Sequence, residues 1–242
     1  MDSLEALATT RPPPSRAPRA EAPVLVPPVT VPPVTVPRGL AAGTKRGLDV
    51  VTALALLVFT APLLLGIALA IRAQDGGPVL FRHTRCGRGG TSFGLWKFRT
   101  MHPDAAERLA VLLEGDPHAE AEWARTRKLR RDPRVTRLGR FLRRSSLDEL
   151  PQLVNILRGD MSVVGPRPVM ADELARYGAL ASVMSAARPG VTGLWQVSGR
   201  NDLDFATRVA LDADYVRRWS LGRDARILLR TVPVVLLAKG AY

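Results

Sequence analysis

The longest apolar stretch of the chain runs from Val50 to Ile71 and contains no charged side chain over 22 residues. A continuous helix of that length would extend about 33 Å, which is enough to cross a hydrocarbon layer of ~30 Å. Helices buried inside soluble proteins rarely run so far without a charge. The pattern therefore predicts a helix that inserts into a membrane.

The residues around this stretch bear on the path of the helix. Basic side chains stand on both sides of it, namely Arg38, Lys45 and Arg46 before it and Arg72, Arg82, Arg85 and Arg88 after it. Because the positive-inside rule places such residues at the cytoplasmic surface, both ends are expected there. Pro62 removes one intrahelical hydrogen bond and can bend the helix, and the Thr60 hydroxyl is close enough to bond a freed carbonyl. These features favour a re-entrant helix over a spanning one.

Residues 76–101 contain short apolar runs separated by glycine-rich turns, which predict a small β-hairpin or an irregular sheet. Lys97 and Arg99 alternate with Trp96 and Phe98, as on a strand with cations on one face and aromatic residues on the other. The alternation fits an amphipathic edge strand and a phosphate-facing strand equally well, so it does not separate the two.

Residues 104–131 have the composition and spacing of helices, broken at Gly115 and Pro117. The next segment repeats arginine every three residues, with leucine and phenylalanine between: Arg134, Arg137, Arg140 and Arg143. On a helix this spacing gives a cationic stripe beside an apolar one, which suits the headgroup layer of a membrane. A solvated basic face is the plainer alternative.

Two adjacent acids, Asp148 and Glu149, lie in the segment RRSSLDELPQL. Ser146 followed three residues later by Glu149 matches a capping box, which explains an isolated pair in purely structural terms. Cations and the helix dipole are expected to keep both carboxylates ionised, because Arg143 and Arg144 precede them. An ionised carboxylate at a phosphate-attracting helix start also suits a nucleophile that attacks phosphorus, and two of them can share a Mg²⁺.

The segments after the acidic pair add candidate phosphate ligands. In RGDMSVVGPRP, Arg167 stands between Pro166 and Pro168, and a backbone held in this way suits bidentate phosphate binding by the guanidinium. RPGVTGLWQVSGRND is a further glycine-rich loop with basic side chains, including Arg200, and RVALDADYVRRWS predicts a helix that carries Asp212.

Composition narrows the class of partner. The formal net charge of +13 over 242 residues predicts a polyanion: nucleic acid, anionic lipid or a phosphorylated substrate. Aromatic residues make up 5% of the chain, so stacking platforms for nucleic acid are scarce. Cys86 is the single cysteine, which excludes an intrachain disulfide and fits a reducing compartment. The first forty residues hold half of the twenty prolines and predict an extended, solvated tail, not a signal peptide.

With these motifs the chain resembles the bacterial sugar transferase family, the monotopic polyprenyl-phosphate phosphoglycosyl transferases. The resemblance runs from about Lys45 to Tyr242 and rests on KRGLDVV, GPVLFR, WKFRTM, RRSSLDELPQLVNILRGDMSVVGPRP, RPGVTGLWQVSGRN, LDADYVRRWSL and the terminal GAY. One departure is Ala61-Pro62 at the expected bend, where the family often has Ser-Pro. Alanine has no hydroxyl to return to the backbone.

The resemblance implies a specific reaction. Members transfer a sugar-1-phosphate from a UDP-sugar to undecaprenyl phosphate and release UMP, at the start of exopolysaccharide or O-antigen synthesis; glucose or galactose is the expected sugar here. Asp148 would form a covalent aspartyl-phosphosugar intermediate, Glu149 would orient the site or assist the incoming phosphate, and Mg²⁺ would bind to both. The expected substrate-binding residues are Lys97, Arg99, Arg143, Arg167 and Asp212.

The fold implied is an α/β membrane-associated monotopic fold, with one re-entrant membrane helix and a compact cytosolic domain that has amphipathic interfacial helices and a small sheet. We expect a Pro-rich tail at 1–40, the membrane helix at 41–73 and the transferase domain at 74–242. Its place would be the cytoplasmic face of the bacterial inner membrane, with membrane lipids and no nucleic acid as partners; a homodimer is left open. The alternative is a non-catalytic basic membrane scaffold that binds anionic lipid or nucleic acid, in which Asp148→Asn changes only stability, by about 1 kcal/mol.

Overall fold

The computed structural model of the protein describes residues 39–126, 129–199 and 202–236. These residues belong to one compact unit spanning 31–242. Residues 1–38 of the predicted Pro-rich tail, Arg200 and the terminal GAY segment lie outside the described residues. Helices dominate the described part, and the strands form two small two-stranded sheets, so the predicted α/β class holds only in this helix-rich form.

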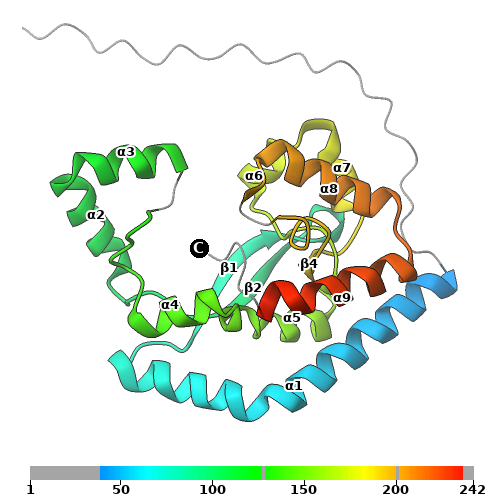
Figure 1. Cartoon of the computed structure of the whole chain (residues 1–242), viewed down its shortest axis with the longest axis horizontal. Helices are drawn as coiled ribbons and strands as arrows, with labels where there is room; N and C mark the ends of the chain where they lie inside the picture. The colour runs from blue at the N-terminus through cyan, green and yellow to red at the C-terminus, as the bar shows by residue number, and fades with distance from the viewer. Residues whose placement is uncertain (1–38, 127–128, 200–201, 237–242) are drawn as a thin grey trace, which may run out of the picture. The chain divides into compact units, whose positions relative to one another are not determined.

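Figure 1 shows the order of the elements. The helices are α1 (Gly39–Asp75), α2 (Ala105–Gly115), α3 (Pro117–Thr126), α4 (Arg137–Arg144), α5 (Gln152–Arg158), α6 (Ala171–Ala175), α7 (Ala181–Ser185), α8 (Phe205–Arg217) and α9 (Leu221–Leu236), with 3₁₀ turns η1 (Arg88–Gly90), η2 (Leu147–Glu149) and η3 (Gly178–Leu180). The strands are β1 (Leu80–Cys86), β2 (Ser92–Phe98), β3 (Ser162–Val164) and β4 (Gly190–Thr192).

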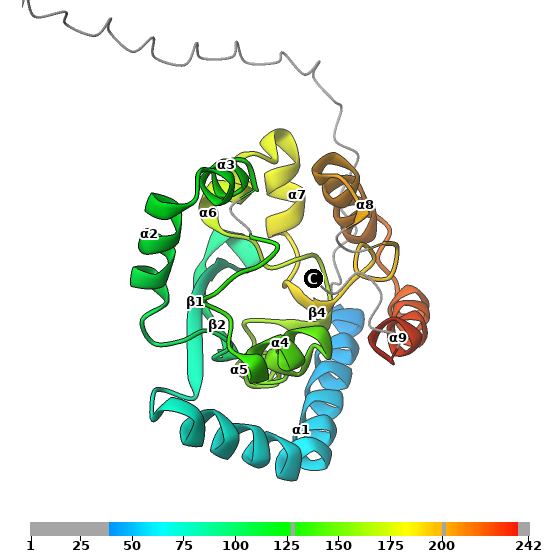
Figure 2. The same cartoon turned by 60° about the vertical axis from the view of Figure 1, so that its left-hand side comes forward.

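The long helix α1 contains the whole apolar stretch, and within the described residues it alone has the length and composition to cross a membrane. It bends near its middle, as both views show (Figures 1 and 2). Pro62 lies inside it, and the Thr60 hydroxyl donates to the Leu56 carbonyl at 2.7 Å. Thr60 therefore does not serve the carbonyl of Val58, which is the one that proline at position 62 deprives of an amide donor.

Most of the apolar surface of α1 is left uncovered by the protein. Phe59 is 83% exposed and Val58 is 70% exposed, whereas Ala53 and Ile67 face the body and are buried. Water would penalise so large an apolar surface, so this face needs a membrane or a partner to cover it.

Both ends of α1 are bonded to the same body. Near the amino end, the Lys45 ammonium donates to a carboxylate oxygen of Asp224 at 2.7 Å. At the carboxyl end, the Arg99 guanidinium donates to Asp75 at 2.8 Å. The two ion pairs hold the flanks of the apolar stretch against one structure.

The predicted hairpin is confirmed. β1 and β2 pair antiparallel, from Leu80 opposite Phe98 to Cys86 opposite Ser92. The turn between them uses Gly89 and Gly90 at φ values of 70° and 76°, a backbone region that glycine adopts without strain. β3 and β4 pair in parallel through the connection that contains α6 and α7, which is a second short sheet that the sequence pattern did not predict.

The core connects α1 to the segments that carry the acidic pair. One buried cluster joins Ala53 of α1, Leu95 of β2 and Ile156 of α5, and another joins Ile67 of α1 to Leu142 of α4. The α4–α5 connection, which holds Asp148 and Glu149, is thereby fixed between the hairpin and α1.

The helices predicted for 104–131 are confirmed over 105–126 as α2 and α3, with the break at Gly115 and Pro117. Residues 127–128 lie outside the described residues, and 130–131 form a turn where helix was expected. The predicted arginine stripe needs a correction, because α4 begins only at Arg137. Arg134 precedes it and forms an ion pair with Asp132 at 2.7 Å. The apolar side of α4 is partly uncovered, with Phe141 60% exposed.

Candidate active site

A cavity of about 460 Å³ opens among the hairpin, the α4–α5 connection, the segment after β3, and the turn after β4. Five of the seven residues predicted for the site line it: Lys97, Arg143, Asp148, Glu149 and Arg167. These residues span seventy positions of the chain, so packing and not sequence proximity brings them together.

The acidic pair lies on the 3₁₀ turn η2, directly after a strained residue. Ser146 has φ 57° and ψ 16°, the one non-glycine residue in the described part with a positive φ. Its side chain makes no capping hydrogen bond, and only its carbonyl accepts the Glu149 amide, at 3.2 Å. The predicted capping box is therefore wrong. A left-handed serine costs about 1–2 kcal/mol and turns the chain so that Asp148 faces inward.

Lys97 of β2 contacts both acids. Its ammonium lies 2.6 Å from Glu149 Oε1 and 3.7 Å from Asp148 Oδ2. The Asp148 side chain is 10% exposed, whereas the Glu149 side chain is 39% exposed. The more exposed acid therefore takes the close ion pair, which leaves the buried acid with its oxygens less engaged.

The pKa of Asp148 is raised to about 6, mainly because burial penalises its charged form. Lys97 and Arg143 oppose the shift and Glu149 adds to it. From the sequence we expected the nearby cations to outweigh burial and to keep the pKa of Asp148 from rising. This expectation is wrong in direction, because burial has the larger effect. The ionised form still prevails at neutral pH, and a poorly solvated carboxylate is a more reactive one.

Arg143 reaches the same cavity from α4. Its Nε donates to the Thr100 hydroxyl at 2.9 Å, and its charge acts on Asp148. The close approach of α4 to residue 100 depends on Gly139, because a Cβ at that position would lie 2.0 Å from the Thr100 carbonyl oxygen. Gly139 therefore determines where the Arg143 guanidinium of the same helix lies.

Arg167 enters the cavity from the Pro166–Pro168 segment. Its guanidinium lies 5.0 Å from the centre of the Trp195 ring, and its Nε is 3.9 Å from Glu173 Oε1. Its backbone amide donates to Asp212 Oδ2 at 3.1 Å. The predicted rigid mounting of this arginine thus comes from a carboxylate and an indole as well as from the two prolines.

Asp212 and Arg99, the other two predicted site residues, do not line this cavity. Asp212 is 1% exposed on α8, where burial raises its pKa to about 7, and it holds the backbone of Arg167 from behind. Arg99 follows β2 and binds the Asp75 carboxylate and the Pro78 carbonyl at the end of α1.

Arg85, on β1, also lines the cavity and was not predicted. The register explains its place. Phe81 pairs with Lys97 and Arg85 pairs with Phe93, so Arg85 and Lys97 share one face of the hairpin. Strand alternation combined with a register would have identified Arg85, but the sequence pattern alone does not provide the register.

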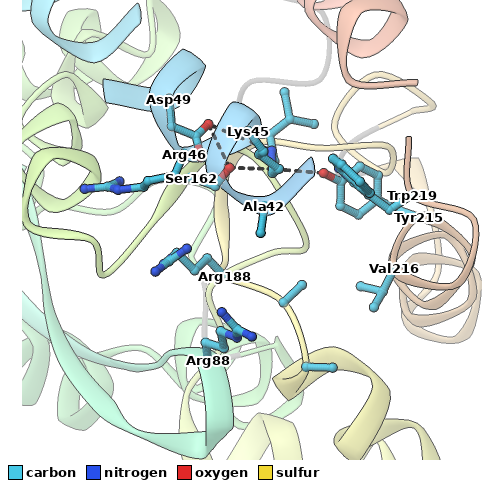
Figure 3. Close-up of a pocket in the computed structure, with 13 residues that line it drawn as sticks. Ala42, Lys45, Arg46, Asp49, Arg88, Ser162, Arg188, Tyr215, Val216 and Trp219 are labelled. Carbon is cyan, nitrogen blue, oxygen red and sulfur yellow. Dashed lines mark hydrogen bonds and ion pairs between the residues drawn. The ribbon is translucent and has the colours of Figure 1, made fainter. Parts of the chain in front are cut away.

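A second, smaller cavity of about 50 Å³ lies where α1 meets β3 and α8 (Figure 3). Several of its polar groups hold α1 to the rest of the protein, for example Arg46, which donates to the Ile156 carbonyl. Lys45 lies 3.8 Å from Asp49, and the Ser162 hydroxyl donates to Asp49 at 2.9 Å. It shares no lining residue with the larger cavity. We assign it to the attachment of α1.

Magnesium would find two carboxylates in the larger cavity. Within the described residues no group of three or more His, Cys, Asp or Glu side chains is arranged to hold a metal. Mg²⁺ bound with a phosphorylated substrate commonly takes only one or two carboxylates, and the phosphate oxygens and water complete the shell. Asp148 and Glu149 fit this arrangement, although Lys97 already occupies part of the space between them.

Comparison with known proteins gives a family for this chain. The model of the family described as "Bacterial sugar transferase" matches residues 40–238. The chain is 50% identical to the exopolysaccharide production protein ExoY of Rhizobium meliloti over 205 residues, covering 85% of this chain and 91% of that protein. It is 48% identical to the UDP-glucose:undecaprenyl-phosphate glucose-1-phosphate transferase of Caulobacter vibrioides over 206 residues, 82% of this chain and 72% of that one.

A third relative is longer. The undecaprenyl-phosphate galactose phosphotransferase of Salmonella typhimurium is 50% identical over 198 residues, which are 82% of this chain and 41% of the relative. The chain thus spans less than half the length of that protein. The matched region of the family model contains the cavity, the acidic pair and the apolar helix, and on this match the chain belongs to the bacterial sugar transferase family.

Proposed function

We propose that this protein transfers a sugar-1-phosphate from a UDP-sugar to undecaprenyl phosphate and releases UMP, through a covalent intermediate on Asp148. The observation that carries the proposal is one cavity in which a buried carboxylate is surrounded by cations and bordered by the membrane helix. Asp148, Lys97 and Arg143 line it together with Leu56, which belongs to the apolar stretch of α1. A soluble diphosphate and a lipid phosphate would meet in such a place.

The first step is attack by an Asp148 carboxylate oxygen on the phosphorus that carries the sugar. A bond forms between this oxygen and phosphorus, and the bond from phosphorus to the bridging oxygen breaks. The electron pair stays on the bridging oxygen, which leaves as part of the UMP phosphate. Lys97 and Arg143 lie where they neutralise the negative charge that collects around the phosphorus.

In the second step an oxygen of the lipid phosphate attacks the same phosphorus. The acyl-phosphate bond to Asp148 breaks, and the carboxylate is regenerated. Glu149, held by Lys97 at 2.6 Å, orients that lysine and assists the incoming phosphate. The charge of Lys97 offsets the repulsion between Glu149 and a phosphate anion.

Asp148 and Glu149 would also hold Mg²⁺, which when bound supplies Lewis-acid neutralisation of the donor's phosphates. The names of the relatives support the choice of sugar, since one is a galactose phosphotransferase and another a glucose-1-phosphate transferase. We infer glucose or galactose as the sugar that is transferred.

The attachment of α1 supports a re-entrant path. A helix whose two flanks form ion pairs with one body, at Asp224 and at Arg99, cannot place those flanks on opposite sides of a membrane. The bend of α1 near its middle, together with Pro62 inside the helix, supports a path that returns to the same face (Figure 2). With basic residues at both flanks, the body would lie on the cytoplasmic face of the inner membrane.

The test is release of UMP by the detergent-solubilised protein with undecaprenyl phosphate, Mg²⁺ and a panel of UDP-sugars. Wild type is compared with Asp148→Asn and with Asp104→Asn, which removes an exposed carboxylate outside the cavity. We expect release with one hexose donor, loss of at least about 10³-fold in Asp148→Asn, and no change in Asp104→Asn.

A protein-bound, sugar-labelled species that forms in wild type and is absent in Asp148→Asn would support the covalent step. If folded, membrane-bound wild type released no nucleotide from any donor, the hypothesis of a non-catalytic membrane scaffold would replace the proposed function. Equal rates in wild type and Asp148→Asn would reject this nucleophile while leaving the reaction in place.

A further inference from the structure

Arg85 is a half-buried cation without a partner at the wall of the reaction cavity. It has no ion pair within 4 Å in the part of the chain that the structure describes, and its Nε is buried there without a hydrogen-bond partner. Desolvating a guanidinium without pairing it is unfavourable. Such a side chain is stabilised when an anionic ligand enters the cavity.

The position of Arg85 separates it from the acidic pair. It lies opposite Phe93, four residues along β2 from Lys97, which corresponds to about 13 Å between backbone positions. Lys97 contacts Asp148 and Glu149, whereas Arg85 forms no ion pair within 4 Å with either acid. Arg85 therefore serves the end of the cavity that is distant from the nucleophile.

Arg167 is the neighbouring charge at this end. Burial, followed by the Arg167 charge, lowers the pKa of the Arg85 guanidinium, and Glu173 and Asp172 partly offset this. Glu173 is 3.9 Å from Arg167, and no carboxylate is as close to Arg85 within the described residues. Of these two guanidiniums, Arg167 has a carboxylate within 4 Å in the described residues, and Arg85 has none.

We propose that Arg85, together with Arg167, binds the nucleotide-side phosphate of the donor and holds it as it leaves. The inference rests on the proposed function. When the bond from the sugar-bearing phosphorus to the bridging oxygen breaks, the electron pair remains on the nucleotide phosphate, whose negative charge increases. Two guanidiniums at one site stabilise that charge through charge-assisted hydrogen bonds. The lipid phosphate enters only afterwards, so Arg85 acts on the first half-reaction.

The test separates the two half-reactions in Arg85→Gln and Arg85→Lys. We expect Arg85→Gln to slow the donor-dependent labelling of the protein by about 10²-fold and to weaken UMP binding by about tenfold. Labelled protein freed of donor should pass its sugar-phosphate to added undecaprenyl phosphate at a rate within about twofold of wild type. Arg85→Lys retains the charge and should recover part of the loss.

Arg82→Gln is the matched control. Arg82 is on the same strand, three positions away and hence on the opposite face, and it is exposed beside Trp96 at 5.6 Å. Its loss removes the same charge and should leave UMP binding and both half-reactions unchanged. A merely structural role of Arg85 would slow both half-reactions together.

Equal slowing of both steps in Arg85→Gln, or unchanged UMP binding, would overturn the inference. UMP binding is measured by equilibrium dialysis in the Asp148→Asn background and needs no turnover. If wild type released no nucleotide from any donor, the proposed function would fail. The measurement of UMP binding would still decide whether Arg85 belongs to a nucleotide-phosphate site. Weaker binding in Arg85→Gln would support the subsite, and equal or absent binding would reject it.

Discussion

Asp148 and Asp212 are both buried carboxylates whose pKa values are raised by burial, but they face different surroundings. Asp148 lies at the cavity with Lys97 on one side, and its pKa is raised to about 6. Asp212 is enclosed behind Arg167, and its pKa is raised to about 7. One is open to a phosphate, whereas the other is open only to a backbone amide. In the proposed function, Asp148 carries out the chemistry and Asp212 positions Arg167.

Asp212 makes the stability of the protein depend on pH. Between its unfolded pKa near 3.8 and its folded pKa near 7, the folded state holds a proton that the unfolded state has lost. The free energy of unfolding therefore falls as pH rises through this range. At pH 8 the buried charge costs on the order of 3 kcal/mol relative to pH 4.

We predict that Asp212→Asn removes this cost. The side-chain amide oxygen can still accept the Arg167 amide hydrogen, so the contact is kept without the charge. The variant should gain stability relative to wild type as pH rises from 5 to 8, measured by denaturant unfolding in detergent. Asp104→Asn, at an exposed position, should track the wild type. Parallel curves for wild type and Asp212→Asn would contradict the prediction.

At the scale of elements, α4 packs closely against the backbone of residue 100. Gly139 faces the Thr100 backbone, and Thr136 caps the helix by accepting the Gly139 amide at 2.8 Å. The same helix carries Arg143, whose Nε bonds the Thr100 hydroxyl. The packing of α4 and the position of Arg143 thus both depend on the contact between α4 and Thr100.

We predict that Gly139→Ala moves α4 outward. The added methyl group meets backbone atoms, which cannot rotate away, so we expect a loss of about 1–3 kcal/mol in stability and a clear fall in activity as Arg143 shifts. Gly222→Ala in α9 is the control, because nothing lies within 4 Å of its added Cβ. Thermal unfolding and UMP release measure the two effects. An unchanged activity in Gly139→Ala would separate Arg143 from the position of α4.

The bend in α1 depends on Pro62, whose ring and missing amide interrupt the helix at the carbonyl of Val58. The Thr60 hydroxyl adds a bond one turn earlier, which also favours bending. Proline supplies the bend here without the hydroxyl that would precede it in Ser-Pro.

We predict that Pro62→Ala straightens α1 and gives a fraction of molecules whose amino-terminal flank crosses the membrane. The topology is read from Ala41→Cys in a Cys86→Ser background, with a membrane-impermeant maleimide added to spheroplasts. The new cysteine should be protected when Pro62 is present and partly labelled in Pro62→Ala. Pro233→Ala, which alters a proline inside α9, should leave the labelling unchanged. Full protection in Pro62→Ala would mean that the two ion pairs alone hold the path.

For the chain as a whole, the main structural problem is how the long apolar helix α1 is fastened to the rest of the protein. The amino-terminal attachment is a buried network in which Asp224 accepts from Lys45 at 2.7 Å, Tyr215 at 2.8 Å and Trp219 at 3.1 Å. The carboxyl-terminal attachment is the pair of Asp75 and Arg99. Arg99 therefore holds the end of α1, although the sequence led us to expect it at the substrate.

We predict that Lys45→Met destabilises the protein by about 3 kcal/mol, because it leaves the buried Asp224 carboxylate without its cation. Arg108→Met, which breaks an exposed pair with Asp104, should cost less than about 1 kcal/mol. Unfolding in detergent measures both. Flotation with vesicles should show that Lys45→Met still binds membrane, since the apolar stretch is intact. A loss equal to that of Arg108→Met would place the attachment elsewhere.

The features that could be predicted from the sequence are local ones. The length of the apolar stretch, the hairpin with its glycine turn, the break between α2 and α3, and the acidic pair after two arginines depend on residues close together in the chain. Periodicity and turn chemistry act over a few positions, so they can be recognised without a fold. The ordered motifs also indicated the family, and the match of its model to residues 40–238 confirms it.

The composition of the site was decided by tertiary packing. Lys97 and Glu149 are 52 positions apart and meet only because β2 packs beside η2. Arg85 enters the cavity through the hairpin register, while Arg99, two residues beyond Lys97, is drawn away to Asp75. The pKa of Asp148 follows from how much water its neighbours exclude. Burial, register and ion pairing arise between segments distant in sequence, and for that reason only the folded chain determines them.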